Sequence, residues 1–298
     1  MKDLREQIRA ALGGRYAGDE LRTVVNALCL EGLGLNPTSV YLGESVSLSE
    51  TQRGWLREAV ERLQAGEPLQ YVLGTAPFAG FELMVDGRVL IPRPETAELV
   101  ALAQALMEVA IQRTKNDAQR VRILDVGTGS GCIAIALKKA LSEAEVTACD
   151  ISEEALEVAR LNAERCDAEL RFVQANVLEL VNESTGQRVG ELPMGCACIV
   201  SNPPYVRRCE KAMMEQRVTE WEPALALFAP DDDPLVFYRA LTRLGQTQVL
   251  AEGGWLVVEI NSDFAFETSA LFTLRGYQDV CVKEDFFGRK RFVMGRKV

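Results

Sequence analysis

The sequence predicts an α/β protein built on a doubly wound, mostly parallel sheet that follows a small helical domain. Three observations support this fold class. Strand-like and helix-like segments alternate from Val121 onward, a pattern typical of such sheets. A glycine-rich turn at residues 127–131 follows the first of these strands and opens a helix. The stretch before residue 72 shows only helical periodicity.

The composition excludes several classes of chemistry. The chain has 298 residues, 48% of them hydrophobic, which is enough to bury a substantial core. It contains no histidine, which excludes an imidazole base, a Ser-His or Cys-His pair and a histidine-ligated metal. With 33 basic and 43 acidic side chains, the formal net charge is −10, and this disfavours direct, stable binding to a nucleic acid.

The cysteines and the N-terminus indicate the compartment. The eight cysteines are scattered, and the nearest pair, Cys196 and Cys198, has C-x-C rather than C-x-x-C spacing, so we expect reduced thiols and no metal site. The first residues are charged and continue into a helical pattern, which argues against a secretory signal. No apolar run approaches the ~20 residues that span a bilayer. We therefore expect a cytoplasmic protein with no membrane partner.

Residues 1–72 are expected to form a domain of their own, a helical bundle. Apolar side chains recur along it at helical spacing. Ser49 and Gln52 have the spacing of a capping box, and Gly66-Glu67-Pro68 ends the helix that they begin. Nothing in this segment carries chemistry, so its surface is either a partner platform or a folding unit.

Residues 73–91 are expected to form a linking β-hairpin, because apolar positions surround two turn signals, Gly80 and Asp86-Gly87. The second domain then spans residues 92–298. It begins with the stiff turn Pro92-Arg93-Pro94-Glu95-Thr96, which leads into a long helix.

Seven strands are predicted in the second domain. They cover residues 121–126, 146–149, 170–174, 196–201, 254–260, 278–283 and 290–295. Helices are expected between them at residues 133–141, from Ser152 onward, at 235–249 and at 264–274. The last two strands are joined by Phe286-Phe287-Gly288 and should pair antiparallel, which leaves one antiparallel strand near the C-terminus.

The first candidate site is the turn Asp125-Val126-Gly127-Thr128-Gly129-Ser130-Gly131. Glycines let a ligand approach the backbone closely, but the G-x-G-x-G spacing differs from the dinucleotide fingerprint and no phosphate-binding lysine is present. With Asp125 two residues before the first glycine, the turn suits a cationic ligand without phosphates, such as the aminoacyl end of S-adenosylmethionine. Asp150 ends the next strand, where a carboxylate can accept ribose hydroxyls. The alternatives are an ordinary tight turn and, for Asp150, a helix cap.

The second candidate site is Asn202-Pro203-Pro204-Tyr205, directly after the fourth strand. The two prolines fix φ and lack N–H donors, and Asn202 offers one acceptor and two donors. Asn202 and the Pro203 carbonyl can accept the hydrogens of a planar amide or amine while the ring of Tyr205 packs on its face. A turn built from Asn-Pro chemistry is the alternative reading.

Together these elements resemble the class I S-adenosylmethionine-dependent methyltransferases, and N-P-P-Y resembles those that methylate a planar nitrogen. Three further segments resemble the release factor glutamine methyltransferases (the HemK-type family): Gly66–Tyr71 with Gly74, the Phe81–Val85 hairpin, and Ile91–Thr96 with Glu98. The resemblance runs from about residue 66 to the C-terminus. It implies the family's seven-stranded Rossmann-like sheet and transfer of a methyl group from S-adenosylmethionine, without a metal, to the N5 of the glutamine in the GGQ loop of peptide chain release factors. S-adenosylhomocysteine is the implied product.

The resemblance also implies site residues. The cofactor would contact Gly127, Thr128, Gly129, Ser130, Gly131, Asp150, Asn176, Val177 and Asn202. The substrate glutamine would contact Asn202, Pro203, Pro204 and Tyr205, with Asn202, Pro203 and Tyr205 catalytic. We add Arg93 and Glu95 as substrate-binding residues of the turn expected to help dock the protein substrate. Two positions depart from the family pattern: Asn176-Val177 stand where an acid and a ring are usual, and Glu259-Ile260-Asn261 stand where the family has Glu, one residue and Gly.

Alternative functions remain open at this stage. A glutamine methyltransferase acting on a ribosomal protein has a similar pattern. An N6-adenine methyltransferase of nucleic acids shares N-P-P-Y but needs a basic duplex-binding face, which this composition disfavours. A non-enzymatic binding module would have to keep both motifs without turnover. We expect a monomer whose helical domain and 93–95 turn help to dock a folded protein substrate.

Overall fold

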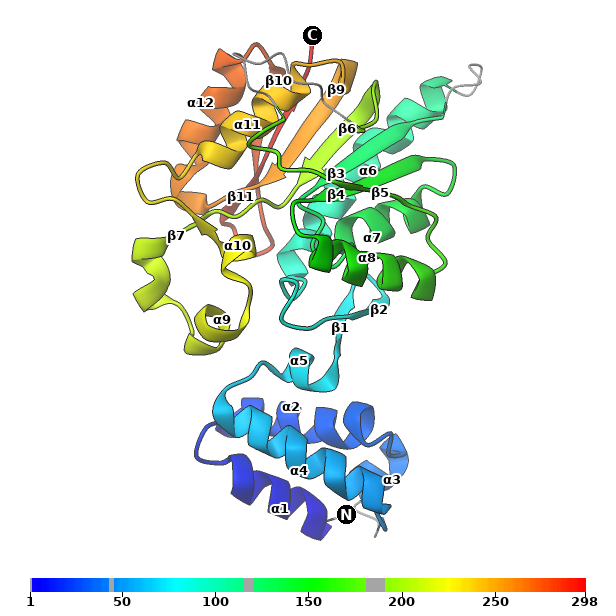
Figure 1. Ribbon diagram of the computed structural model, residues 1–298, viewed down its shortest axis with the longest axis vertical. Coiled ribbons are helices and arrows are strands. Elements are labelled where there is room, and N and C mark those ends of the chain that lie inside the picture. Colours follow the sequence, from blue (N-terminus) through cyan, green and yellow to red (C-terminus); the bar gives the residue numbers. More distant parts are fainter. Residues whose placement is uncertain (1, 43–45, 115–119, 181–190) are drawn as a thin grey trace. The chain divides into compact units, whose positions relative to one another are not determined.

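The computed structural model describes residues 2–42, 46–114, 120–180 and 191–298 (Figure 1). The chain divides into two compact units. The first contains Met1–Ala76 and Glu215–Trp221, and the second contains Pro77–Met214 and Glu222–Val298. In the described part of the chain, no helix is long and apolar enough to cross a membrane.

The first unit is helical, as predicted. Its elements are α1 (Lys2–Leu12), α2 (Gly18–Ala27), the π-helical turn η1 (Leu28–Gly32), α3 (Pro37–Leu42), α4 (Glu50–Ala65) and α5 (Leu69–Leu73). The predicted capping box is confirmed: Ser49 Oγ accepts from Gln52 N (3.2 Å) and Gln52 Oε1 accepts from Ser49 N (3.0 Å). Gly66 ends α4 in the left-handed region, at φ 98°.

A short segment from much later in the chain also belongs to this unit, which the sequence analysis did not predict. It is the helix α9 (Gln216–Trp221), and Arg217 in it forms an ion pair with Glu20 of α2 (2.7 Å). Glu215–Trp221 therefore belongs to the helical unit, although the chain before and after it belongs to the second unit.

The predicted β-hairpin consists of β1 (Thr75–Phe78) and β2 (Phe81–Met84). It turns at Ala79 and Gly80, both with positive φ. The other predicted turn signal, Asp86-Gly87, lies in an irregular loop, where the Asp86 carboxylate accepts from Arg88 N (3.0 Å) and forms an ion pair with its guanidinium (2.7 Å).

The second unit contains a seven-stranded sheet in the order β10-β11-β9-β6-β3-β4-β5. The strands are β3 (Arg122–Val126), β4 (Glu145–Asp150), β5 (Arg171–Gln174), β6 (Cys196–Ser201), β9 (Leu250–Glu259), β10 (Gln278–Glu284) and β11 (Lys290–Arg296). Adjacent strands from β9 to β5 are parallel, and β11 is antiparallel to both of its neighbours. The predicted strand count and the antiparallel strand near the C-terminus are confirmed.

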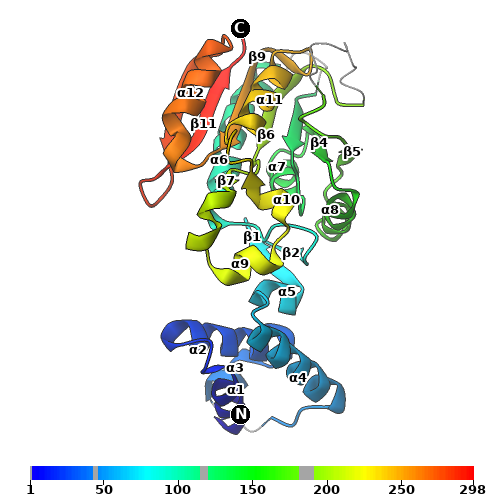
Figure 2. The same cartoon turned by 60° about the vertical axis from the view of Figure 1, so that its left-hand side comes forward.

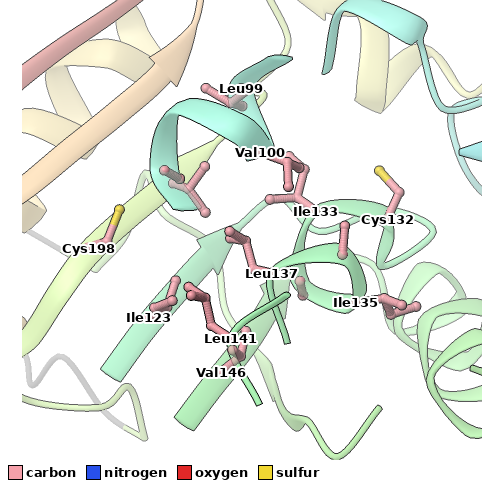
Figure 3. Close-up of a cluster of buried hydrophobic side chains, with 14 of the residues drawn as sticks. Leu99, Val100, Ile123, Cys132, Ile133, Ile135, Leu137, Leu141, Val146 and Cys198 are labelled. Atoms are coloured by element: carbon pink, nitrogen blue, oxygen red, sulfur yellow. The ribbon is translucent and has the colours of Figure 1, made fainter. Parts of the chain in front are cut away.

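Helices cover both faces of this sheet (Figures 1 and 2). They are α6 (Pro94–Thr114), α7 (Cys132–Ala140) and α8 (Glu153–Arg165) on one face, and α11 (Val236–Gly245) and α12 (Ala265–Leu274) on the other. Side chains alternate between the two faces with a period of two, so Ile123 packs with α6 and α7 while Leu124 packs with α11. Figure 3 shows part of the buried cluster on the α6–α7 face, to which Leu99 of α6, Ile133 of α7 and Val146 of β4 all belong.

Several short elements complete the second unit. They are β7 (Val206–Arg207), η2 (Arg208–Met213), α10 (Ala224–Leu227), β8 (Phe228–Ala229), which pairs with β7, and η3 (Ser262–Phe264). The helix predicted over residues 235–249 ends earlier, at Gly245. There the Thr247 hydroxyl donates to Leu244 O (2.6 Å) and accepts from Val249 N (3.2 Å), so the side chain offers the backbone a turn in place of further helix.

Candidate active site

A cavity of about 230 Å³ lies in the second unit, where β3, β4 and β6 end. In a parallel sheet the carboxyl ends of neighbouring strands meet at one edge, which is where ligands bind in open α/β folds. Most of the predicted site residues line this cavity, namely Arg93, Gly127, Thr128, Gly129, Ser130, Asp150, Asn176, Val177, Asn202, Pro203 and Pro204. Glu95, Gly131 and Tyr205 do not line it.

The glycine-rich turn follows β3 and is hydrogen-bonded to the end of β4. Gly127 N and Thr128 N both donate to Cys149 O (2.8 and 3.0 Å). Gly127 and Gly129 have φ of 73° and 53°, which favours glycine, and a Cβ on either would meet nothing within 4 Å, so the space beside them is open. Gly131 differs, because a Cβ there would lie 3.2 Å from Ala159 Cβ; its role is close packing of α7 on α8.

Two carboxylates support this turn. Asp125 is fully buried and accepts from Thr128 Oγ1 (2.7 Å), and burial raises its pKa to about 7. Asp150 accepts from Gly129 N (2.9 Å) through one oxygen and from Ser152 N (3.0 Å) through the other. Each carboxylate oxygen of Asp150 has a further lone pair, so the group can brace the turn and still accept from a ligand.

Asn176 and Val177, which depart from the family pattern, form one wall of the cavity. Asn176 Oδ1 accepts from Leu178 N (3.0 Å), and its Nδ2 donates to Glu179 Oε1 (2.8 Å). The side chain of Asn176 therefore shapes its own turn, and Val177 presents an apolar surface.

The N-P-P-Y segment leaves the end of β6. Ser201 Oγ donates to Val126 O (2.6 Å) and ties the segment to β3 beside the glycine turn. Asn202 Nδ2 donates to Thr96 Oγ1 (3.1 Å), and the hydroxyl of Tyr205 donates to Glu259 Oε1 (3.1 Å). The ring of Tyr205 is half-buried against the α11 side of the core, and burial raises the pKa of its hydroxyl.

Sequence reasoning assigned no role to Thr96 or Glu222. Thr96 is buried, lines the cavity and donates to Glu259 Oε2 (2.8 Å). The side chain of Glu222 is 1% exposed and holds Arg93 in an ion pair (2.6 Å) while accepting from Ile91 N (3.2 Å). Thr96 could have been singled out within the 91–96 segment, but its partner is 163 positions away, and no local signal marks Glu222.

Asn261, the other departure from the family pattern, contacts the N-P-P-Y segment. Its Nδ2 donates to Tyr205 O (3.3 Å) and its Oδ1 accepts from Asp263 N (3.0 Å). Among the residues that the structure describes, no group of three or more cysteine or acidic side chains is arranged to hold a metal ion.

Comparison with known proteins decides the family. Residues 103–221 match the family model described as "Methyltransferase small domain", and residues 3–74 match the one described as "PrmC N-terminal domain". Over its full length the chain is 41% identical to the release factor glutamine methyltransferase of Bacteroides thetaiotaomicron, all of which is covered. The protein of that name from Flavobacterium psychrophilum is 35% identical, with 98% of each chain covered. This chain belongs to the release factor glutamine methyltransferase family.

Membership identifies the chain as a methyltransferase, and the family implies use of S-adenosylmethionine. The similarity to solved structures concerns only the fold of this chain. The catalytic domain of hMettl16 in complex with the MAT2A 3′UTR hairpin 6 has a TM-score of 0.52 at 16% identity, with 86% of this chain and 85% of that one covered. The predictions of a class I methyltransferase fold and of the family are confirmed.

Proposed function

We propose that this protein transfers a methyl group from S-adenosylmethionine to the side-chain amide nitrogen, N5, of the glutamine in the GGQ loop of peptide chain release factors. The observation that carries the proposal is that Asn202 and Pro203 share one cavity with the glycine turn and Asp150. The relatives named above support the substrate class. Action on release factors would place the protein in the cytoplasm.

The residues around the glycine turn fit S-adenosylmethionine. The open space beside Gly127 and Gly129 admits a ligand against the backbone, and Asp150 keeps lone pairs for ribose hydroxyls. Asn176 and Val177 would border the adenine. When bound, the cofactor supplies a methyl group already activated by its sulfonium, so the protein's contribution is orientation and electrostatics. We propose S-adenosylhomocysteine as the product and no metal requirement.

We propose that Asn202 and the Pro203 carbonyl bind the hydrogens of a substrate NH₂ group. An amide nitrogen is a poor nucleophile because its lone pair is delocalised. Acceptors on the two hydrogens turn that lone pair toward the cofactor side of the cavity and stabilise the positive charge that develops on nitrogen. The proton becomes acidic once the nitrogen is alkylated, so no histidine or other strong base is needed.

Docking of the folded factor is proposed for the helical domain, residues 1–72, together with the turn at 93–95. The residues that line the cavity lie in the second unit, so we assign the chemistry to that unit and substrate docking to the helical one. We propose that the enzyme works as a monomer without stable binding to nucleic acid. Arg93 would act mainly by holding its turn, because Glu222 pairs with its guanidinium.

The test is incubation of the purified protein with methyl-labelled S-adenosylmethionine and an intact release factor. We expect label in the wild-type factor and none in a factor whose GGQ glutamine is replaced by alanine. A ribosomal protein and an adenine-containing duplex serve as competing substrates. Faster labelling of either than of the release factor would overturn the proposal.

A further inference from the structure

Four polar side chains from three separate chain segments form a continuous hydrogen-bonded chain, and two of them, Thr96 and Asn202, line the cavity. Asn202 Nδ2 donates to Thr96 Oγ1 (3.1 Å), Thr96 Oγ1 donates to Glu259 Oε2 (2.8 Å), and the Tyr205 hydroxyl donates to Glu259 Oε1 (3.1 Å). Thr96 lies in the first turn of α6, Glu259 ends β9, and the other two follow β6. Thr96 and Glu259 are 2% and 1% exposed, so water does not compete for these bonds.

The direction of each bond follows from the chemistry of its partners. An ionised carboxylate only accepts, so each oxygen of Glu259 takes the hydrogen of one hydroxyl. The pKa of Glu259 is raised on balance, chiefly by burial, while the bonds from Thr96 and Tyr205 and the charge of Arg291 limit that rise. With its one hydrogen given to Glu259, the Thr96 oxygen can only accept from Asn202. This selects the NH₂ end of the Asn202 amide as the end that faces Thr96.

We infer that Glu259 and Thr96 are positioning residues that fix the side-chain amide of Asn202 with its oxygen toward the cavity. A side-chain amide is nearly symmetrical in shape, and only its hydrogen bonds decide which end faces which way. The other orientation would direct the NH₂ of Asn202 at the NH₂ of the substrate, so two donors would face each other. The inference rests on the proposed function for the identity of the substrate, but the orientation is a property of this chain alone.

Through its other oxygen Glu259 also holds Tyr205, which lies outside the cavity lining but in the same N-P-P-Y segment as Asn202. Because the Tyr205 hydroxyl is held at Glu259, the ring cannot turn freely about its bonds. Asn261 donates to the Tyr205 carbonyl (3.3 Å) and limits the backbone as well. The Glu259 carboxylate thus holds both ends of the N-P-P-Y segment, Tyr205 directly and Asn202 through Thr96.

The central test replaces only the Thr96 hydroxyl. Thr96→Val has the same shape but cannot bond Asn202 or Glu259, whereas Thr96→Ser keeps the hydroxyl. We expect Thr96→Val to lower kcat about 10- to 100-fold, the scale of a lost hydrogen bond to a charged group, with cofactor Kd changed less than about two-fold. Thr96→Ser should recover most of the loss. A Thr96→Val enzyme with wild-type kcat, or a Thr96→Ser enzyme as slow as Thr96→Val, would overturn the inference.

A matched control separates orientation from packing. Thr268 in α12 is also fully buried, and within the described residues its hydroxyl has no hydrogen-bond partner. Thr268→Val is the same chemical change away from the cavity and should leave kcat unchanged. A comparable loss in Thr268→Val would mean that buried threonine packing, and not the hydroxyl, controls the rate.

A double-mutant cycle and a spectroscopic measurement complete the test. Glu259→Gln can donate where the carboxylate accepts, so it should lower kcat at least as much as Thr96→Val, and the double variant should be no slower than the slower single one. If the kcat losses of the two single variants added in the double variant, Glu259 and Thr96 would act independently, which would contradict the inference.

The spectroscopic readout is independent of turnover. The side-chain NH₂ signal of Asn202, assigned as the one missing in Asn202→Asp, should exchange slowly in the wild type and at least ten-fold faster in Thr96→Val. Equal exchange rates would refute the bond to Thr96. If the wild type fails to methylate a release factor, the proposed function fails, while the exchange experiment still decides the orientation.

Discussion

Asn162 offers a direct test of how the hairpin and the cofactor turn are held together. This residue of α8 is fully buried and makes three hydrogen bonds: its Oδ1 accepts from Met84 N (2.6 Å), and its Nδ2 donates to Met84 O (2.9 Å) and to Ser130 O (2.9 Å). One side chain thus connects β2, α8 and the glycine-rich turn. Asn162→Leu keeps the volume and removes all three bonds.

The magnitude follows from what the substitution leaves behind. Each bond contributes about 1 kcal/mol net, and three backbone groups would lose their partner, so we expect a loss of roughly 3–5 kcal/mol in the free energy of unfolding. This corresponds to a fall of ~10 °C in the Tm of the second unit. Because Ser130 lines the cavity, cofactor affinity should also fall several-fold.

The assay is thermal unfolding with and without S-adenosylmethionine, together with calorimetric titration of the cofactor. The transition that the cofactor shifts upward reports the second unit. Leu161→Ala, at a 44% exposed position on the same helix, is the control and should change Tm by less than 2 °C. An Asn162→Leu protein whose Tm lies within 2 °C of the wild type would refute this reasoning.

The remaining predictions concern the cofactor, the chemistry, pH and the partner. Asp150→Ala should weaken cofactor binding by roughly 1.5–3 kcal/mol; unchanged calorimetric affinity would contradict its role. Asn202→Ala should lower kcat on the order of 10²–10³ with cofactor affinity retained, and normal turnover by a stable variant would refute the mechanism. Burial raises the pKa of Asp125 to about 7, so between about pH 4 and pH 7 the folded state binds more protons than the unfolded one. The free energy of unfolding of the wild type, relative to that of Asp125→Asn, should therefore rise as pH falls through that window. A difference between the two proteins that does not change with pH would exclude a raised pKa at Asp125. Removal of residues 1–72 should preserve cofactor binding and abolish methylation of the intact factor; full activity of the folded remainder would show that the helical unit does not dock the substrate.

The parts of the site that the sequence predicts are those whose chemistry lies in contiguous residues. The glycine turn, Asp150 and Asn202 each follow a strand in an alternating α/β pattern, so their approach to one edge of the sheet follows from topology. The strand count and the antiparallel strand near the C-terminus are predictable for the same reason. Helix ends are less so, as Thr247 shows, because a local side-chain bond decides them.

The parts that the sequence does not predict depend on partners far apart in the chain. Thr96 and Glu259 are 163 positions apart, and Arg93 and Glu222 are 129 apart. Neither pair has a spacing that a helix or strand period would reveal. The placement of Glu215–Trp221 in the helical unit is equally non-local, because its partners lie about 200 positions earlier in the chain, as Glu20 does for Arg217. Such contacts also decide which end of a side-chain amide faces a substrate. A sequence motif can therefore locate a site without showing how its side chains are oriented.

Asn261 shows how a departure from a family pattern can be accommodated. The family's usual glycine at this position would be essential only if the backbone required positive φ, but Asn261 has φ −68° and ψ 126°, which any residue adopts. Its side chain caps η3 through Asp263 N and donates to Tyr205 O. The asparagine therefore adds a brace to the segment that ends in Tyr205 without backbone strain. Asn261→Gly should leave Tm nearly unchanged and lower kcat by a few-fold, because Tyr205 then loses its backbone contact but keeps Glu259. A Tm loss above ~5 °C with unaltered kcat would show that Asn261 stabilises the fold and does not support the site.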